Sequence, residues 1–256
     1  MFMEERQAKI LELLAAEGKV LVKELAEMFE VTEDSIRKDL GTLEAEGKLR
    51  RTYGGAVPIQ ESLKMTEANR RRVLDVDAKR KIALSALKLI ESQDLVFLDN
   101  STISIAIAEI LSRSGKTYRI LTSMIDVLVM LAVNPNIDVI FGGGQLDKSR
   151  DGFNDVLNLE FLEHFRPDVA FIGVVGADFK KNSLTTNSVD GGMRKAKVLN
   201  LSKKNFLVAE SRKLGMEGKF SFATFEKISA LITEIEPPKE ILQAAKDLNV
   251  EVIFSE

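Results

Sequence analysis

The stretch from Val31 to Val57, VTEDSIRKDLGTLEAEGKLRRTYGGAV, limits what the chain can fold into more than any other stretch. Thr32 is a favourable helix N-cap, and the acidic residues after it suit the first turn of a helix. Three apolar residues recur at i, i+4 and i+7 and make one apolar face: Ile36, Leu40 and Leu43. Gly47 suits the residue just after a helix, and the basic segment beyond it runs into Gly54 and Gly55. The pattern predicts a helix followed by a short two-stranded wing.

The opposite face of this helix is polar, and the wing is basic. At about 100° per residue, four polar side chains share that face, with Arg37 at its flank: Asp34, Ser35, Lys38 and Thr42. A polar helix face beside a cationic hairpin fits a DNA major groove and the phosphates next to it. With the N-cap and the tip of the wing included, the predicted DNA contacts are Thr32, Ser35, Arg37, Lys38, Thr42, Lys48, Arg50, Arg51 and Tyr53.

A charged helix face is often only solvated, so DNA binding has an alternative. Asp34 and Lys38 have the spacing of an ordinary i, i+4 ion pair. Residues 1–57 contain nine Lys and Arg residues against twelve Asp and Glu residues. The basic residues concentrate on the helix and the wing, whereas the acidic ones crowd the helices before them. This distribution favours DNA binding over the other uses of small helical modules.

Composition excludes several classes of protein. The 256 residues carry a net charge of −3, so any nucleic-acid binding must be local. The absence of cysteine rules out disulfides and thiol chemistry, and the one histidine, His164, lies in an expected amphipathic helix. No apolar run has the length of a membrane span, and no signal peptide is recognisable. We expect a cytoplasmic protein that uses no membrane, metal, cofactor or catalytic residue.

The residues before the wing complete a small helical domain. Residues 4–17 and 23–30 have helical periodicity. Helix, helix, turn, helix and wing together predict a winged helix-turn-helix domain over 1–57. Residues 58–72 are expected to be a linker, because most of them lack periodicity. A long helix is then expected over about 69–92.

Short apolar runs alternate with helical segments from Asp94 onward. The expected strands lie at 95–99, 118–122, 138–143, 168–176, 205–210, 228–234 and 250–254. Strands that alternate with helices predict a mostly parallel α/β sheet covered on both faces. The fold class is therefore an α/β domain over 73–256 joined to the N-terminal winged helix-turn-helix. We expect the α/β domain to sense an effector and to oligomerise.

Small and polar residues follow the expected strands, where ligands bind in open α/β sheets. Hydroxyls and free amides at strand-to-helix turns bind anions, because N–H groups and the helix dipole point at the ligand. Asp99 and Asp178 suit sugar hydroxyls, and Lys195 and Lys213 suit a phosphate. The same residue types occur in ordinary turns, and it is their convergence that favours a small-anion pocket. The predicted effector contacts are Asp99, Asn100, Ser101, Thr102, Thr122, Ser123, Gly143, Asp178, Lys195 and Lys213.

The N-terminal domain resembles that of the DeoR family of bacterial transcriptional regulators. That family has a Ser/Thr turn, an IRRDL-like core, a Leu-Glu-x-x-Gly step and an Arg-x-His-Gly-Gly-Ala wing. The corresponding positions here are Thr32, 36–40, 43–47 and 51–56. The departures are Ser35 for Thr, Lys38 for Arg and Tyr53 for His. A resemblance of this length, at fixed offsets, implies a DNA-binding regulator.

The rest of the chain resembles the C-terminal domain of the same family, which is related to ribose-5-phosphate isomerase and senses phosphorylated sugars. The matching segments are Lys79 with Ile82, 99–103, 121–124, Gly142-Gly143 and Lys213. Departures from the family pattern are Ser101 for Gly, Ile103 for Thr, Ser123 for Asn, Glu210 for Asp, and Gly191 for an acidic residue. The resemblance implies a sugar-phosphate sensor. The departures lie in the segments that sense the effector, so the class of effector is the part of this implication that they affect.

Three functions compete on these grounds. The first is a transcriptional repressor of sugar-metabolism genes, which binds operator DNA as a homodimer or larger homo-oligomer and responds to a phosphorylated sugar. The second is a sugar-phosphate isomerase with an appended helical domain, but Phe179 stands where that enzyme has a second carboxylate. The third is a regulator with a vestigial pocket, whose α/β domain only oligomerises. We expect the first.

Overall fold

The computed structural model describes residues 3–58, 71–147, 152–153 and 155–255. The chain divides into two compact units, Met1–Thr66 and Glu67–Glu256. This division falls inside the predicted linker 58–72, most of which lies outside the described residues, so the linker remains a prediction. Within the described ranges, no helix has the length and the apolar run needed to cross a bilayer.

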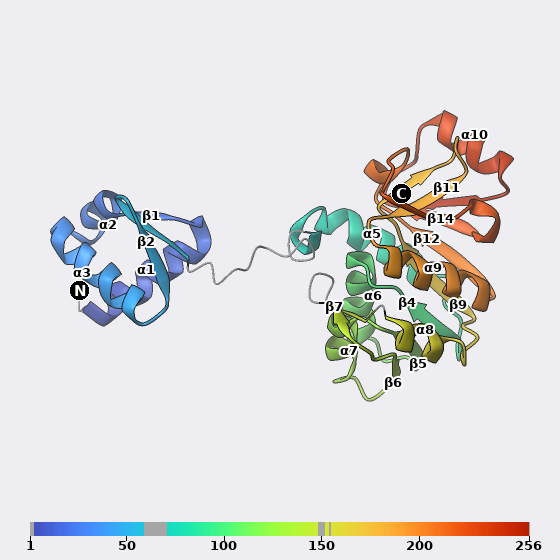
Figure 1. The fold of residues 1–256 in the computed structure, drawn as a ribbon, viewed down its shortest axis with the longest axis horizontal. Helices are drawn as coiled ribbons and strands as arrows, with labels where there is room; N and C mark the ends of the chain where they lie inside the picture. The colour runs from blue at the N-terminus through green and yellow to red at the C-terminus, as the bar shows by residue number, and fades with distance from the viewer. Residues whose placement is uncertain (1–2, 59–70, 148–151, 154, 256) are drawn as a thin grey trace. The chain divides into compact units, whose positions relative to one another are not determined.

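The N-terminal unit is the predicted winged helix-turn-helix (Figure 1). Its elements are α1 (Met3–Glu17), β1 (Val20–Leu21), α2 (Val22–Phe29), α3 (Glu33–Ala45), β2 (Leu49–Thr52) and β3 (Gly55–Pro58). Antiparallel pairing of β2 with β3 forms the expected hairpin, and β1 pairs with the other edge of β3. The order of elements is therefore the one that the sequence predicts.

Local sequence sets both ends of α3. The Thr32 side chain accepts a hydrogen bond from the Ser35 backbone N–H at 3.3 Å, as an N-cap does. At the other end, Gly47 has a φ of 71°, and the Lys48 N–H donates to the Leu43 carbonyl at 2.8 Å. This is a Schellman motif, in which glycine takes a left-handed conformation without the strain of a Cβ. The chain therefore turns directly from the helix into the wing.

One apolar cluster holds the N-terminal unit together. It joins the predicted face of α3 to residues of α1, α2 and the wing: Ile10, Leu14, Leu25, Ile36, Leu40, Leu43 and Leu49. Asp39 is also buried, and its carboxylate accepts hydrogen bonds from Arg6 at 2.5 Å and from Gln7 at 3.4 Å. These contacts tie α1 to α3 and so fix which face of α3 remains exposed.

The C-terminal unit is built on a seven-stranded sheet with the order β15-β14-β12-β9-β4-β5-β6. The strands are β4 (Leu95–Leu98), β5 (Tyr118–Thr122), β6 (Ile137–Phe141), β9 (Val169–Gly173), β12 (Lys204–Val208), β14 (Ala230–Thr233) and β15 (Glu251–Phe254). All neighbouring pairs are parallel, which confirms the predicted sheet. The chain grows from β4 toward β6 and then returns to β9 on the other side of β4. Such a switch point is where open α/β sheets bind ligands.

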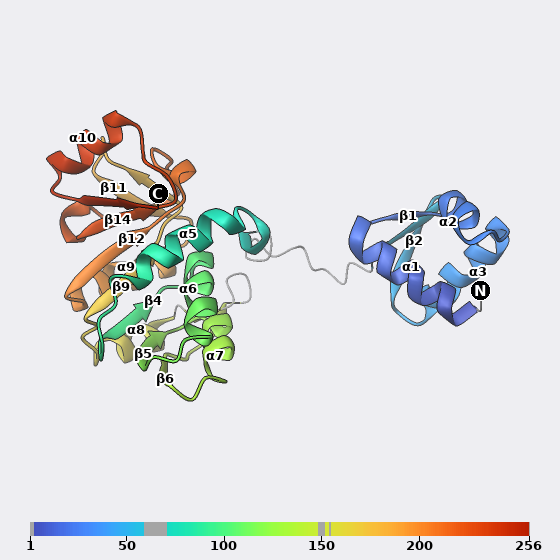
Figure 2. The ribbon, with the colours of Figure 1, turned by 180° about the vertical axis from the view of Figure 1, so that it is seen from behind.

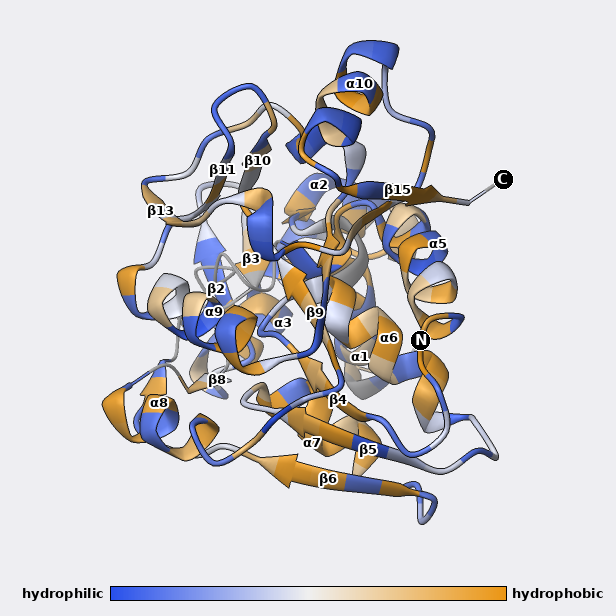
Figure 3. Cartoon of the chain, turned by 90° about the vertical axis from the view of Figure 1, so that its right-hand side faces the viewer, coloured by the Kyte–Doolittle hydropathy of each residue, from blue (hydrophilic) through white to orange (hydrophobic). Residues whose placement is uncertain are grey.

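Helices cover both faces of this sheet. The helices are α5 (Val76–Leu87), α6 (Thr102–Ser112), α7 (Ile125–Leu131), α8 (Val156–Leu162), α9 (Val189–Leu201) and α10 (Lys239–Asp247). Figure 2 shows α5, α6 and α7 on one side of the sheet, and Figure 1 shows α8 and α9 on the other. Figure 3 shows that the strands between them are mostly hydrophobic, with hydrophilic sections in β5 and β6.

Alternate strand residues fill two separate cores. Leu98, Phe171 and Val208 pack with α5, α6 and α7 in one core. Phe97, Ile172 and Leu207 pack in the other core, with α9 and α10. Strands buried on both faces read as continuous apolar runs, which is why the sequence reveals them so clearly.

Several short elements of this unit escape sequence analysis. A second, antiparallel sheet consists of β10 (Gly176–Asp178), β11 (Ser183–Thr186) and β13 (Phe220–Ala223). A small hairpin pairs β7 (Leu146–Asp147) with β8 (Gly152–Phe153). Turns of 3₁₀ helix occur at Ser211–Lys213 and Phe225–Lys227. These elements are too short or too polar to show a period of their own.

The prediction of one long helix over 69–92 is wrong. Residues 71–73 form a helical turn, the chain bends at Leu74 and Asp75, and α5 runs only from Val76 to Leu87. Asp75 has a φ of 50° and a ψ of 43°, a left-handed conformation that no helix interior accommodates. Arg212 contacts the Asp75 carboxylate at 2.7 Å from far along the chain. Periodicity, a local signal, does not reveal a bend held by such a contact.

Candidate functional site

The polar face of α3 is open to solvent, as its helical period predicts. Lys38 and Thr42 are exposed and Ser35 is partly exposed. Two hydroxyls are already used locally: Ser35 Oγ lies 3.0 Å from Thr32 Oγ1, and Thr42 donates to the Lys38 carbonyl at 3.2 Å. Among the described residues, the Lys38 ammonium has no ion-pair partner. It is therefore the most available cation of this face.

Arg37, at the flank of that face, contacts two acidic residues of its own helix. Its guanidinium lies 2.5 Å from Glu33 and 3.0 Å from Asp34. All three side chains are exposed, so water screens these ion pairs and they add little to stability. A phosphate group would compete with the two carboxylates for Arg37 at small cost.

The wing places its cations beside α3. The Arg51 backbone N–H donates to Glu44 at 2.8 Å, and the Arg51 guanidinium lies 3.6 Å from the same carboxylate. Lys48 contacts Glu46 at 2.8 Å. Arg50 is exposed without an ion pair in the described part of the chain. Arg37 and Arg51 both border one hollow between α3 and the wing, so these two cations lie on the same side of the unit.

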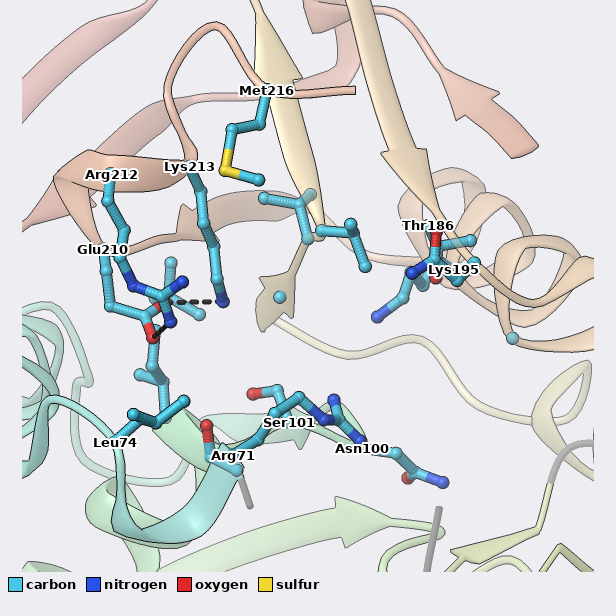
Figure 4. Close-up of a pocket in the computed structure, with 18 of the residues that line it drawn as sticks. Arg71, Leu74, Asn100, Ser101, Thr186, Lys195, Glu210, Arg212, Lys213 and Met216 are labelled. Carbon is cyan, nitrogen blue, oxygen red and sulfur yellow. Dashed lines mark hydrogen bonds and ion pairs between the residues drawn. The ribbon is translucent and has the colours of Figure 1, made fainter. Parts of the chain in front are cut away.

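A cavity of about 190 Å³ opens at the switch point of the C-terminal sheet (Figure 4). Its wall includes residues 100–103 after β4, residues 173–175 around the end of β9, and residues just after β12. A Cβ on Gly173 would lie 2.7 Å from the Ser101 Cβ. Glycine at this position therefore lets the turn after β4 pack against β9.

The N-terminus of α6 points donors at this cavity. Ser101 is the N-cap, and its Oγ accepts a hydrogen bond from the Ser104 N–H at 3.1 Å. The N–H groups of Thr102 and Ile103, the first two residues of α6, have no acceptor among the described residues. Both residues line the cavity. Free N–H groups at the positive end of a helix dipole form an anion site.

A buried ionic cluster adjoins the N-terminus of α6. Asp99 is fully buried, and its carboxylate accepts hydrogen bonds from Arg194 at 2.7 Å, from Lys195, and from the Gly173 N–H at 3.1 Å. Arg194 also donates to Asn100 Oδ1 at 2.7 Å. Burial acts to raise the pKa of Asp99, but the charges of Lys195 and Arg194 hold it below its usual value. Two buried cations, Arg194 and Lys195, therefore lie beside the N-terminus of α6.

A second charged cluster occupies another part of the wall. Figure 4 shows Glu210, Arg212 and Lys213 on one side of the cavity and Lys195 with Thr186 on the other. Glu210 lies 2.5 Å from the Lys213 ammonium and 3.3 Å from the Arg212 guanidinium. Burial acts to raise the pKa of Glu210, but Lys213 and then Arg212 lower it overall. In the described part of the wall, Glu210 is the only carboxylate.

The structure brings together half of the predicted effector contacts. The residues that line the cavity are Asn100, Ser101, Thr102, Lys195 and Lys213. The assignment of sugar hydroxyls to Asp99 and Asp178 needs correction. Asp99 is enclosed by its two cations and does not line the cavity. Asp178 caps the β10–β11 turn instead, where it accepts from the N–H groups of Lys180 and Lys181 at 2.9 and 3.0 Å.

The contacts predicted after β5 and β6 also lie outside the cavity wall. Thr122 donates to the Leu98 carbonyl at 2.9 Å and so joins two strands. The Asn158 side chain binds Ser123 Oγ at 2.8 Å and the Gly143 carbonyl at 3.3 Å. These side chains stabilise turns beyond the switch point. The rule that ligands bind at the carboxyl ends of strands does not by itself distinguish these side chains from the residues at the switch point.

Sequence analysis missed several residues of the wall: Arg71, Leu74, Thr186, Asn187, Arg194, Glu210, Arg212 and Met216. Glu210 ends a predicted strand, and Arg212 directly precedes the predicted Lys213. The rule that ligands bind at the carboxyl ends of strands could therefore have identified both residues. Thr186 belongs to the unpredicted antiparallel sheet, and Arg71 precedes the unpredicted bend. No local pattern marks these last two residues.

Family models match both units of the chain. Residues 6–62 match the DeoR-like helix-turn-helix domain. Residues 74–235 match the DeoR C terminal sensor domain, which is more than half of the chain. The chain belongs to the DeoR family. This membership makes it a DNA-binding transcriptional regulator with a sensor domain, as the sequence predicts.

Curated relatives of this DeoR-family regulator match over nearly its full length. It is 32% identical to the uncharacterized HTH-type transcriptional regulator YulB of Bacillus subtilis, over 98% of this chain and 96% of the relative. It is 29% identical to the HTH-type transcriptional regulator GolR of Listeria innocua, over the whole of both chains (100% and 100%). The glycerol-3-phosphate regulon repressor of Escherichia coli is 27% identical, over 97% of each chain.

Solved structures match the α/β unit more weakly. Ribose 5-phosphate isomerase A from Neisseria gonorrhoeae matches with a TM-score of 0.41 and 15% identity, over 54% of this chain and 53% of that chain. The curated relatives are regulators, so the comparisons do not favour the isomerase alternative.

Proposed function

We propose that this DeoR-family regulator represses sugar-metabolism genes and that a phosphorylated sugar or polyol in its cavity controls its affinity for operator DNA. It acts in the cytoplasm, as a homodimer or larger homo-oligomer. The observation that carries the proposal is the cavity at the switch point, where two N–H groups of α6 that have no acceptor among the described residues lie near the buried cations Arg194 and Lys195. A relative named as a glycerol-3-phosphate regulon repressor supports the same class of effector.

The phosphate of the effector binds at the N-terminus of α6. Ser101 and Thr102 lie at that end of the helix, and Lys195 lines the same cavity. Lys213 also lines the cavity, contacts Glu210 at 2.5 Å, and is the second cation proposed for this phosphate. The hydroxyls of the effector bind Glu210 and the side-chain amides of Asn100 and Asn187, which replace Asp99 and Asp178 in this role.

The DNA contacts divide into two kinds. Lys38, with Ser35 and Thr42 beside it, is proposed to read base edges in the major groove, because these side chains occupy the exposed face of α3. The cations of the wing are proposed to bind phosphates, which position the protein without reading sequence. Thr32 caps α3, and Arg37 and Tyr53 border the same surface.

An oligomer is proposed because one winged domain covers little DNA. Sequence-specific regulators gain affinity by placing two DNA-binding domains on one duplex. Light scattering of the full chain, alone and with a duplex selected from random sequence, measures its mass. We expect at least a dimer at micromolar concentration, and a monomer under both conditions would refute this part of the proposal.

A thermal-shift panel tests the effector. The panel holds glycerol 3-phosphate, fructose 1-phosphate and glucose 6-phosphate, each paired with its unphosphorylated parent. A ligand at about a hundred times its dissociation constant stabilises the fold by roughly 2.7 kcal/mol, which raises the melting temperature visibly. We expect at least one phosphorylated member to raise it and its parent to leave it unchanged.

A pair of variants locates the binding site. Thr102→Val combined with Lys213→Ala should abolish the difference between phosphorylated and unphosphorylated members. The matched control combines Thr117→Val with Lys116→Ala, two exposed residues before β5, and should keep it. Equal shifts from both members of every pair would refute the anion site. No shift from any member would favour a vestigial pocket.

A further inference from the structure

Part of the cavity wall is the segment that follows the connection from the winged helix-turn-helix. Arg71 and Leu74 line the cavity, and both precede α5 (Figure 4). Between them and α5 lies the bend at Asp75. This segment contains the first residues that the structure describes after the winged helix-turn-helix.

The bend is held by contacts from outside residues 71–75. The Lys79 ammonium is almost fully buried and donates to the backbone carbonyls of Arg71 and Leu74. Its burial lowers the pKa of Lys79. Arg72 contacts Asp126 at the start of α7 at 2.5 Å. Asp75 itself keeps a left-handed backbone, which is unfavourable for a residue with a Cβ and persists only where surrounding contacts enforce it.

Arg212 joins this bend to the charged cluster of the cavity. Its Nε lies 2.7 Å from the Asp75 carboxylate, and its terminal nitrogen lies 3.3 Å from Glu210. Glu210 in turn contacts Lys213 at 2.5 Å. Arg212, Glu210 and Lys213 all line the cavity, whereas Asp75 does not. One guanidinium thus lies between the ligand site and the strained residue of the bend.

We propose that the Arg212–Asp75 ion pair is a latch that holds the bend over residues 71–75, and that an anionic ligand opens it. The inference rests on the proposed function, since it concerns how the same cavity regulates DNA binding. An anion that enters competes with Asp75 and Glu210 for Arg212 and Lys213. Asp75 then loses the contact that holds its left-handed conformation, and the segment relaxes.

The latch couples two binding equilibria. A ligand shifts DNA affinity only as far as it binds two states of the protein with different affinity, and DNA shifts ligand affinity by the same factor. The latched and unlatched bends are these two states. Whether the effector releases or recruits DNA depends on which of the two states binds DNA more tightly. The experiment applies whether the ligand raises or lowers the affinity for DNA.

The decisive variant is Asp75→Asn, because asparagine tolerates a left-handed backbone and loses only the charge. DNA affinity is measured by fluorescence anisotropy with a duplex selected from random sequence, with and without each sugar phosphate of the panel. We expect the wild-type dissociation constant to change at least about five-fold with a ligand that binds. In Asp75→Asn, the ligand-free constant should equal that of liganded wild type, and the ligand should change it no further.

One further variant is a control for this test, and another replaces Asp75→Asn if that variant is unstable. Glu109→Gln removes the acidic partner of the exposed Arg113 ion pair on α6 and should keep the full wild-type change. Asp75→Ala removes the carboxylate and, unlike glycine, does not favour the left-handed backbone, so it carries the same test if Asp75→Asn melts early. A wild-type ligand response in the Asp75 variant that folds would overturn the latch.

Hydrogen exchange separates failure of the latch from failure of the proposed function. Without any ligand, amides at 79–82, which are the first of α5 with helical acceptors, should exchange at least about tenfold faster in Asp75→Asn than in wild type or Glu109→Gln. Unchanged exchange would overturn the latch even if ligands bind. Faster exchange in a protein whose melting no sugar phosphate alters would support the latch and refute the proposed effector.

Discussion

The DNA-binding surface of this regulator and the buried cluster beside its cavity use charged residues in opposite ways. In the winged helix-turn-helix, Arg37 pairs with residues three and four positions away, and all of these side chains are exposed. In the sensor, Asp99 is fully buried and pairs with Arg194, 95 positions along the chain. Exposed pairs leave their charges available to a partner at little cost, whereas buried pairs must stay intact for the fold to survive. The DNA-binding surface should therefore tolerate the substitutions that the sensor does not.

The largest expected effect is that of Asp99→Asn. The variant keeps the shape of the side chain but leaves Arg194 and Lys195 buried without their carboxylate. Breaking one partner of a buried ion pair costs about 3–5 kcal/mol, so the free energy of unfolding of the sensor should fall by that amount. Urea unfolding measures it. The counterpart in the other unit is Asp34→Asn, whose exposed pair should contribute less than about 1 kcal/mol. Similar losses from both variants would contradict the contrast.

The same carboxylate makes the stability of the sensor depend on pH. The pKa of Asp99 is lower in the folded protein than in the unfolded chain. Its contribution is therefore fully present above the unfolded pKa of about 3.9 and is lost as the pH falls through the folded pKa. Unfolding free energies measured from neutral to acid pH should fall less steeply in Asp99→Asn than in wild type.

Gly173→Ala should cause the next largest loss of stability, and it compares a tightly packed position with an open one. Its Cβ would lie 2.7 Å from the Ser101 Cβ, so the turn after β4 must move. Overpacking of this kind costs about 1–3 kcal/mol, and the thermal shift with sugar phosphates should disappear. The control is Gly143→Ala, since a Cβ there meets no atom within 4 Å. Unchanged melting and ligand response in Gly173→Ala would mean that this close approach is unimportant.

Thr32→Ala tests a local interaction in the DNA-binding unit. Loss of the N-cap that accepts from Ser35 should destabilise this unit by about 1 kcal/mol, measured by its thermal unfolding. Thr42→Ala is the control, because alanine is a better helix former and the Thr42 hydroxyl only bonds the Lys38 carbonyl. Its unfolding temperature should stay the same or rise slightly. A greater loss from Thr42→Ala than from Thr32→Ala would reverse the expected roles.

Arg51→Ala should leave the fold nearly unchanged and act on DNA alone. If Arg51 binds one phosphate, the variant weakens binding to all duplexes alike and lowers the salt slope by about one unit. Lys38→Ala should instead change the preference among duplexes that differ in sequence. Anisotropy titrations at several salt concentrations measure both effects. Equal weakening on every duplex by Lys38→Ala would assign Lys38 to the phosphates.

Whether a contact joins residues that are near or far apart along the chain decides how much of this structure the sequence predicts. Thr32 and Gly47 end α3 through neighbours within a few residues, so their roles are readable from the sequence. The parallel strands are readable because both of their faces are apolar. Glu210 lies beside a predicted residue, yet the bend at Asp75 is held by Arg212, 137 positions away. Asp99 was expected in contact with the effector because nothing local indicates that two cations enclose it.

The most direct test of the whole account is an anisotropy titration of a selected DNA duplex, with and without a saturating sugar phosphate that raises the melting temperature of the protein. The dissociation constant for DNA should change at least about five-fold with this ligand and not with its unphosphorylated parent. A ligand that stabilises the sensor while the dissociation constant for DNA stays the same would contradict it.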